Sequence, residues 1–130
     1  MLLGIKTDSP VAHLSLCDSQ GAVIDQLDWQ ADRQLAHGLL EKIDHFLGEY
    51  ELSVHDLTGL FVFRGPGSFT GLRIGITVMN TLAYALAIPI VGEVGDTWRE
   101  IAVDRLANGQ NDKVILPFYG AEARITGPKK

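Results

Sequence analysis

The chain has 130 residues, 46% of them hydrophobic, and its formal net charge at pH 7 is −5. This length suits one domain, and the hydrophobic fraction excludes wholesale disorder because it is sufficient for a packed core. The acidic charge disfavours nucleic-acid binding by bulk electrostatics, and the single cysteine, Cys17, excludes an internal disulfide framework and a cysteine-rich zinc site.

The hydropathy pattern predicts a cytoplasmic protein without a targeting segment or a membrane span. The opening apolar residues are followed by Lys6 and Asp8 too soon for the apolar stretch of a signal peptide. The longest weakly charged run, residues 65–92, contains Arg73 and several polar residues, whereas a bilayer span needs about 20 mostly apolar residues. We therefore expect a buried helix and a buried strand in this run.

Three strands are predicted in the first thirty residues. Residues 2–6 form a short apolar run, and residues 11–17 alternate with a period of two. A turn cluster at residues 18–21 is followed by a third extended run, residues 22–29. This spacing predicts a three-stranded antiparallel meander.

Helices and strands alternate in the rest of the chain. We expect a helix from Ala31 to Tyr50, a buried strand at 57–63, a helix ending near Ala87, a strand at 90–91 and a helix at 97–107. The apolar stripe of the first helix consists of Leu35, Leu39, Ile43, Phe46, Leu47 and Tyr50. Thr97 and Glu100 have the spacing of a capping box at the start of the last helix.

The element order β-β-β-α-β-α-β-α predicts an α/β fold with a mixed five-stranded sheet and helices on its faces. This order resembles a single ribonuclease H-like lobe of the actin-like ATPase superfamily. The lobe is expected to span residues 1–107, with a linker and short tail at 108–130.

A glycine-rich turn precedes the second helix. Its candidate residues are Gly65, Gly67, Ser68, Thr70 and Gly71. Glycines before a helix can let the backbone approach a phosphate, but the spacing matches neither a Walker loop nor a dinucleotide-binding fingerprint. The other interpretation is a tight strand-to-helix turn with Ser68 or Thr70 as the N-cap.

The stretch Gly65-Pro66-Gly67-Ser68-Phe69-Thr70-Gly71-Leu72-Arg73-Ile74-Gly75 resembles the signature of the TsaB (YeaZ) family of threonylcarbamoyladenosine biosynthesis proteins. His37, residues 57–64 and residues 88–92 also fit, so the resemblance covers roughly residues 2–105. It implies a non-catalytic partner of the related enzyme TsaD in forming t6A on tRNA, with tRNA contacted only indirectly. It further implies pairing through a helical bundle, homodimers, and a TsaE-like ATPase as an additional partner.

Two features depart from the family pattern. Lys6 lies where the family has an aspartate, which in actin-like enzymes supports the metal of a bound nucleotide. The chain also has one expected lobe where the family has two, although the superfamily binds nucleotides between lobes. Both departures argue against ATP chemistry, so no cofactor and no metal are expected. The alternative is a nucleotide-binding phosphotransferase completed by homodimerisation.

Catalytic arrangements are scarce in the sequence. His37, Glu41 and His45 share a helix face, but the two histidines would be about 12 Å apart at 1.5 Å per residue, too far for one ion. Ser68 lies in Gly-Ser-x-x-Gly, which is not the nucleophile-elbow pattern Gly-x-Ser-x-Gly. We therefore predict no catalytic residue and no enzymatic activity of the chain alone.

The second helix carries more apolar surface than one sheet face would cover. Its stripes are Leu72, Ile76, Met79 and Ala83, then Ile74, Val78, Leu82 and Ala85, and a polar third of Arg73, Thr77, Asn80 and Tyr84. A second buried surface is covered either by another subunit or by this chain's own first and third helices. Together with the resemblance, this pattern favours helix-mediated pairing. The candidate partner-binding residues are His37, Leu40, Leu72, Arg73, Ile76, Thr77, Asn80, Ala83 and Tyr84.

The tail has two interpretations. Its basic residues Arg124, Lys129 and Lys130 suit an arm that clasps a TsaD-like partner or touches tRNA phosphate. Alternatively, residues 114–116 add an edge strand and the terminus frays.

Overall fold

The computed structural model describes residues 1–120 and has the predicted element order. Its elements are β1 (Leu2–Lys6), β2 (Val11–Cys17), β3 (Val23–Gln30), α1 (Leu35–Gly48), β4 (Gly59–Phe63), α2 (Phe69–Leu86), β5 (Ile90–Glu93) and α3 (Trp98–Ala107). Short 3-10 turns at Asp32–Gln34 and Val54–Asp56 precede α1 and β4. Within residues 1–120, no helix combines the length and apolarity needed to cross a bilayer.

The five strands form one mixed sheet in the order β3-β2-β1-β4-β5. The first three strands are antiparallel neighbours, which confirms the predicted meander. Strands β4 and β5 continue from β1 in parallel, with Leu2 opposite Gly59 and Leu60 opposite Ile90. The α/β ribonuclease H-like fold expected from the sequence is therefore confirmed.

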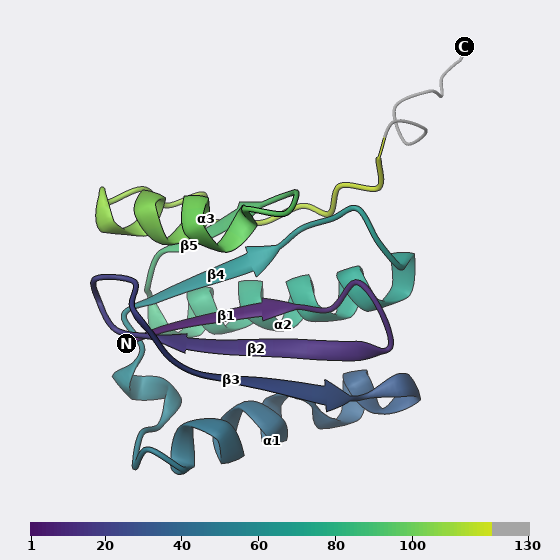
Figure 1. Ribbon diagram of the computed structural model, residues 1–130, viewed down its shortest axis with the longest axis horizontal. Coiled ribbons are helices and arrows are strands. Elements are labelled where there is room, and N and C mark those ends of the chain that lie inside the picture. Colours follow the sequence, from purple (N-terminus) through teal and green to yellow (C-terminus); the bar gives the residue numbers. More distant parts are fainter. Residues whose placement is uncertain (121–130) are drawn as a thin grey trace.

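Helices α1 and α2 pack beside each other along one face of the sheet, whereas α3 packs on β4 and β5 from the other (Figure 1). Trp98 at the start of α3 meets Phe61 and Phe63 of β4, with ring centroids 5.6 and 5.8 Å apart. The intervening β4 residues face α2 because strand side chains alternate between the two faces. The largest fully buried side chains are Leu3, Ile5, Leu14, Leu16, Leu39, Ile43, Leu47, Leu60, Phe61, Leu72, Met79 and Ile90. Cys17 is also fully buried, as expected, and burial raises the pKa of its thiol.

The first helix is shorter than predicted at both ends. Its start moves from Ala31 to Leu35 because Asp32 has a φ of 47°, which a helix interior does not accept. The amides of Ala31 and Asp32 donate instead to the Pro10 carbonyl at 3.0 and 3.1 Å. The helix ends at Gly48, so Tyr50 leaves the apolar stripe, is 39% exposed and donates a hydrogen bond to Asp25. That bond raises the pKa of the Tyr50 phenol.

The predicted capping box at Thr97 and Glu100 is wrong. Thr97 is the N-cap residue of α3, but its side chain accepts no capping hydrogen bond, because its backbone is not in the extended conformation that aims an N-cap hydroxyl at the helix amides. A capping box is present instead at Ser53 and Asp56, where Ser53 has an extended backbone with φ −123° and ψ 175°.

Residues 108–120 form no edge strand, so the interpretation of 114–116 as a strand is also wrong. Residues 111–119, called the strap below, run along β5 and are held by side chains. The Ile90 amide donates to Asn111 Oδ1 at 3.1 Å, and the Gly92 amide donates to Asp112 Oδ2 at 3.0 Å. The Asp112 amide also donates to the Ile90 carbonyl at 2.8 Å, so two side chains and one amide, rather than a neighbouring strand, satisfy the outer edge of β5.

Arg105 of α3 fastens the start of the strap. Its guanidinium donates to the Asp112 carboxylate, to Glu93 Oε2 at 2.9 Å and to Gln110 Oε1 at 2.7 Å. Burial is the largest single influence on the pKa of Asp112 and would raise it. The hydrogen bonds from Arg105 and from the Gly92 amide, together with the charges of Arg105 and Arg64, outweigh burial and lower that pKa below its ordinary value. The interactions with Asp112 and Glu93 raise the pKa of Arg105.

The rest of the strap is fastened to α2 and to the end of β4. Asn80 donates from Nδ2 to the Ile115 carbonyl at 3.0 Å and accepts from the Ile115 amide at 2.8 Å. Arg64 donates to the Leu116 carbonyl at 2.9 Å, and its own carbonyl accepts from the Phe118 amide at 2.7 Å. The expected basic residues Arg124, Lys129 and Lys130 lie outside the described residues.

Candidate functional site

The glycine turn joins β4 to α2 at the carboxyl ends of the parallel strands. Three glycines of this region, spaced four residues apart, face the β1–β2 connection. A Cβ atom would lie 2.4 Å from the Asp8 Cβ at Gly67, 2.4 Å from the Thr7 carbonyl oxygen at Gly71, and 2.2 Å from Thr7 Oγ1 at Gly75. These positions need glycine because the connection lies directly against the backbone of the turn and of the first part of α2.

Hydrogen bonds fix this close approach. The Thr7 hydroxyl donates to the Gly71 carbonyl at 2.8 Å, and the Ser68 amide donates to the Asp8 carbonyl at 2.9 Å. Ser68 is the N-cap residue of α2, but its side chain makes no capping hydrogen bond, and Thr70 lies inside the helix. The turn thus has a packing role, which supports its interpretation as a tight strand-to-helix connection.

Gly65 has a separate role at the strap. Its φ of 135° favours glycine, and a Cβ atom there would lie 1.9 Å from the Phe118 carbonyl oxygen. The turn therefore contacts two distant parts of the chain, the β1–β2 connection and the strap.

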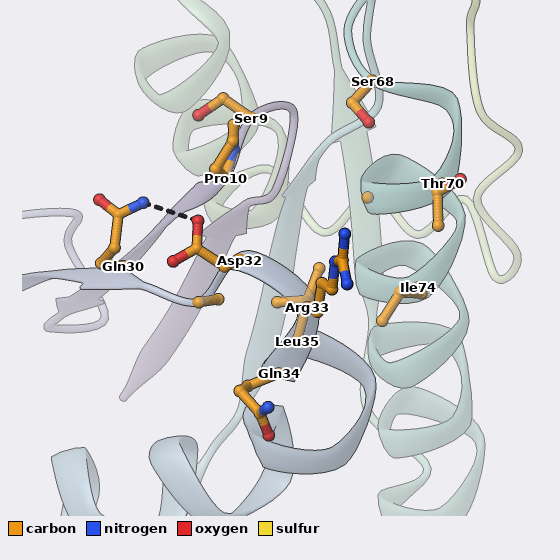
Figure 2. Close-up of a pocket in the computed structure, with 12 residues that line it drawn as sticks. Ser9, Pro10, Gln30, Asp32, Arg33, Gln34, Leu35, Ser68, Thr70 and Ile74 are labelled. Atoms are coloured by element: carbon orange, nitrogen blue, oxygen red, sulfur yellow. Dashed lines mark hydrogen bonds between the residues drawn. The ribbon is translucent and has the colours of Figure 1, made fainter.

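A cavity of about 840 Å³ opens between the glycine turn and the start of α1. Figure 2 shows Ser68, Thr70 and Ile74 on the α2 side of the cavity and Gln30 and Asp32 on the opposite side, with Arg33 between them. Gln30 Nε2 donates to Asp32 Oδ1 at 2.9 Å. The lining has one acid and one base, so it has no acid pair for general acid–base chemistry.

No metal site accompanies this cavity. Among residues 1–120, no three His, Cys, Asp or Glu side chains gather closely enough to hold an ion. His37, Glu41 and His45 are exposed along α1, consistent with ordinary surface residues. Lys6, at the position of the family's aspartate, forms an ion pair with Asp8 at 2.9 Å.

The structure divides the candidate partner-binding residues into three groups. His37, Arg73 and Thr77 are exposed, as are Leu40 at 53% and Tyr84 at 90%. These five residues lie on α1 and α2, and their role in partner binding stays a prediction.

For three other candidates the predicted contact with a partner is wrong, because the residues are buried. Leu72 is 0% exposed, and Ile76 and Ala83 are 4% exposed, because the stripe that contains them faces this chain's own sheet. A side chain in that position is not available to another subunit. Asn80 is corrected as well, because both ends of its amide are occupied by the backbone of Ile115.

A shallow hollow of about 400 Å³ follows the junction of the two helices. Ala36 contributes from α1, and Ile74 and Val78 contribute from α2. The latter two belong to the second apolar stripe, which the helical period located correctly but which was not included among the candidates. Because they are only half-buried, they leave apolar surface beside Arg73 and Thr77.

Phe69 is a surface residue that the sequence patterns did not single out. It is 55% exposed, stacks on Tyr119 of the strap with centroids 4.7 Å apart, and lies 5.1 Å from the Arg73 guanidinium. The sequence feature that could have identified Phe69 is its position as the first residue of α2, next to the glycine turn. Together, Phe69, Arg73, Thr77 and Tyr84 of α2 with His37 and Leu40 of α1 are called the α1/α2 surface below.

Comparisons with known proteins identify the relatives of the chain. Residues 29–94, just over half of the chain, match the family model of TsaD, described as tRNA N6-adenosine threonylcarbamoyltransferase. The chain is 44% identical over 80 residues to the tRNA threonylcarbamoyladenosine biosynthesis protein TsaB of Bacillus subtilis, covering 61% of this chain and 32% of that protein. It is 26% identical over 123 residues to TsaB of Buchnera aphidicola, covering 90% of this chain and 59% of that protein.

The fold comparison agrees with these matches. The structure of YeaZ from Pseudomonas aeruginosa superposes with a TM-score of 0.64 and 29% sequence identity, covering 72% of this chain and 43% of that one. The chain thus spans between about a third and three-fifths of the length of the curated relatives described above.

Proposed function

Because the chain belongs to the TsaB (YeaZ) family and its residues 29–94 match the TsaD family model, we propose that it takes part in tRNA t6A modification as a non-catalytic partner. In this proposal it pairs with a TsaD-like enzyme through the α1/α2 surface and supports threonylcarbamoyl transfer by scaffolding or allostery. It works in the cytoplasm, and tRNA is held mainly by the enzyme, in keeping with a net charge of −5.

The observation that carries the proposal is the apolar character of the exposed part of two adjacent helices. Leu40, Phe69 and Tyr84 are each more than half exposed. A single exposed apolar side chain is common, but several on two adjacent helices are typical of an interaction surface. Aromatic residues and arginine are enriched where protein interfaces concentrate their binding energy, and the surface offers Phe69, Tyr84 and Arg73. Small apolar side chains along the junction of α1 and α2, such as Ala36, would let a partner helix approach closely.

Co-elution with a purified TsaD-like protein in size-exclusion chromatography tests the proposal. We expect the wild-type chain to form a heterodimer, and Tyr84→Glu and Leu40→Glu each to weaken it at least tenfold in calorimetry. The matched control is Ile101→Glu, since Ile101 is a 43% exposed apolar residue on α3, away from this surface. Absence of a wild-type complex, or equal weakening by all three variants, would contradict the proposal.

The same surface is proposed to form homodimers when the enzyme partner is absent. Light scattering of the chain alone would then show a dimer that Tyr84→Glu converts to a monomer. If homodimer and heterodimer use one surface, adding the TsaD-like protein should dissociate the homodimer. A homodimer that persists beside the heterodimer would show that two surfaces are used.

A further inference from the structure

The strap has an apolar outer side. Ile115 points inward and is 3% exposed, with its Cγ2 atom 2.9 Å from the position that a Cβ would take at Gly92. Val114 and Leu116, on either side of it, are 62% and 68% exposed, and Phe118 is exposed as well. Exposure thus alternates along the strap, as it does in an extended segment with one side covered. Val114, Leu116 and Phe118 are called the outer row below.

Helix α2 holds the strap at two points of one flank. Asn80 binds both backbone groups of Ile115, and the ring of Phe69 stacks on that of Tyr119. Successive residues of a helix turn by about 100°, so Asn80 lies only about 20° around the axis of α2 from Phe69. The flank that carries these two residues therefore faces the strap.

The most exposed apolar side chain of α2 lies toward the same flank. Tyr84, 90% exposed, lies about 60° around the axis from Phe69, and Arg73 lies about 40° from it. Ile74 and Val78, which border the hollow shared with α1, lie about 140° and 180° from Phe69. A protein that contacts both Phe69 and Tyr84 is therefore brought beside the strap.

The α1/α2 surface is too small to hold a stable partner by itself. It consists of six residues, whereas a stable interface takes about 800 Å² and about 20–30 residues from each protein. A partner seated on this surface must also cover what lies next to it. The outer row is the neighbouring apolar surface on the side of Phe69 and Tyr84, and contiguous apolar patches mark interaction sites.

We propose that the outer row is a second part of the surface that binds the TsaD-like enzyme, so that the enzyme spans α2 and the strap. This inference rests on the proposed function. The enzyme's segment is apolar opposite the outer row and carries a carboxylate opposite Arg73, which forms no ion pair with an acid of residues 1–120. Because Asn80 and Arg64 already fasten the strap, binding has little ordering of the backbone to offset.

Calorimetry of the full chain with a purified TsaD-like protein tests the outer row. We expect Leu116→Glu to weaken the heterodimer about tenfold and Leu116→Met to bind like the wild type. Ile101→Glu is the matched control, because it introduces the same carboxylate at an exposed apolar residue of α3 and should leave the affinity unchanged. Amide exchange at Ile115 should be the same in Leu116→Glu and in the wild type, which shows that the strap stays fastened. In the wild type, exchange of the Leu116 amide should slow when the enzyme binds.

The outcomes separate this inference from the proposed function. A complex that Tyr84→Glu weakens and Leu116→Glu does not would overturn the role of the outer row and leave the proposed function in place. Absence of any wild-type complex would overturn both. If Leu116→Glu abolishes a homodimer in light scattering but leaves the affinity for the enzyme unchanged, the outer row binds a second copy of this chain and the inference is wrong.

Discussion

Helix α2 has apolar side chains on two faces. One face is buried against the sheet, and the other is exposed to solvent. The inner stripe, which contains Leu72, Ile76 and Met79, is at most 4% exposed and packs on the sheet. The outer positions Phe69 and Tyr84 are 55% and 90% exposed. Between them lies a flank where Asn80 holds the strap. Apolar character on a helix therefore does not by itself identify a partner surface; the direction of each side chain relative to the sheet decides.

Ile76→Glu should give the largest effect, because it places a carboxylate in the packed inner face. We expect a loss of about 4 kcal/mol or more in the free energy of unfolding, enough to abolish the cooperative transition. Urea unfolding followed by circular dichroism measures it. The control Ile101→Glu should lose less than about 0.5 kcal/mol. If the Ile76→Glu variant instead folds normally and loses only pairing, Ile76 binds the partner and does not belong to the packed inner face.

Gly71→Ala comes next, since it tests the contact between the inner side of α2 and the β1–β2 connection. The added Cβ would lie 2.4 Å from the Thr7 carbonyl oxygen, a backbone atom that cannot turn away. We expect a loss of about 2–3 kcal/mol by chemical denaturation. Gly48→Ala in α1 is the matched control, because a Cβ there meets nothing within 4 Å. That change should stabilise by up to about 1 kcal/mol, and equal destabilisation by both changes would refute this explanation.

Asn80→Ala tests the flank of α2. Removing the amide leaves the Ile115 N–H and carbonyl without their partner, at a cost of about 1–2 kcal/mol. Amide hydrogen exchange at Ile115 should accelerate at the same time. Thr81→Ala serves as the control, because the Thr81 hydroxyl bonds only within the helix, to the Thr77 carbonyl. Unchanged exchange at Ile115 would show that Asn80 does not hold the strap.

Acid should loosen the other end of the strap. The pKa of Asp112 is lowered in the folded chain, so its contribution is present above the unfolded pKa of about 3.9 and is lost as pH falls through the lower folded value. Between pH 7 and pH 3 the wild type should therefore lose more stability than Asp112→Asn. The difference should be below about 1 kcal/mol, because the pair is partly solvated. Identical pH profiles would contradict the role of the Arg105 interaction.

Tyr84→Glu should have the smallest effect on stability, although it introduces the same carboxylate as Ile76→Glu. With the ring 90% exposed, the free energy of unfolding should stay within about 0.5 kcal/mol of wild type. Its expected effect is on pairing alone. A Tyr84→Glu variant that unfolds in denaturant like Ile76→Glu would remove the distinction between the two faces.

The sequence was sufficient to predict the order of the helices and strands and the mixed five-stranded sheet. Alternation in residues 11–17 and the cluster of glycines at residues 65–71 are local patterns, and local patterns determine where strands and turns lie. The start of α1 was missed because Pro10 accepts the amides of Ala31 and Asp32, a contact between segments twenty residues apart. The capping box at Thr97 failed for a different reason: spacing predicts which side chains can cap, whereas backbone conformation decides whether they do.

The sequence predicted which residues of α2 share a stripe, but not which stripe is exposed for pairing. A helical period identifies which residues share a stripe, so it grouped Leu72 with Ile76 and Arg73 with Thr77 correctly. It does not say which stripe faces the sheet, because that depends on how α1 and α2 share one face. Asn80 was interpreted as an interface residue because nothing in its neighbourhood of the sequence indicates Ile115, thirty-five residues later.

The strap has a consequence for how these molecules behave at high concentration. An edge strand with free N–H groups is a template on which a second chain can add a strand, and such addition leads to aggregation. In β5, the Ile90 and Gly92 amides are already engaged by Asn111 and Asp112, and the Ile90 carbonyl accepts from the Asp112 amide. The sheet is thereby closed to growth at this edge by two side chains and one amide, without a sixth strand.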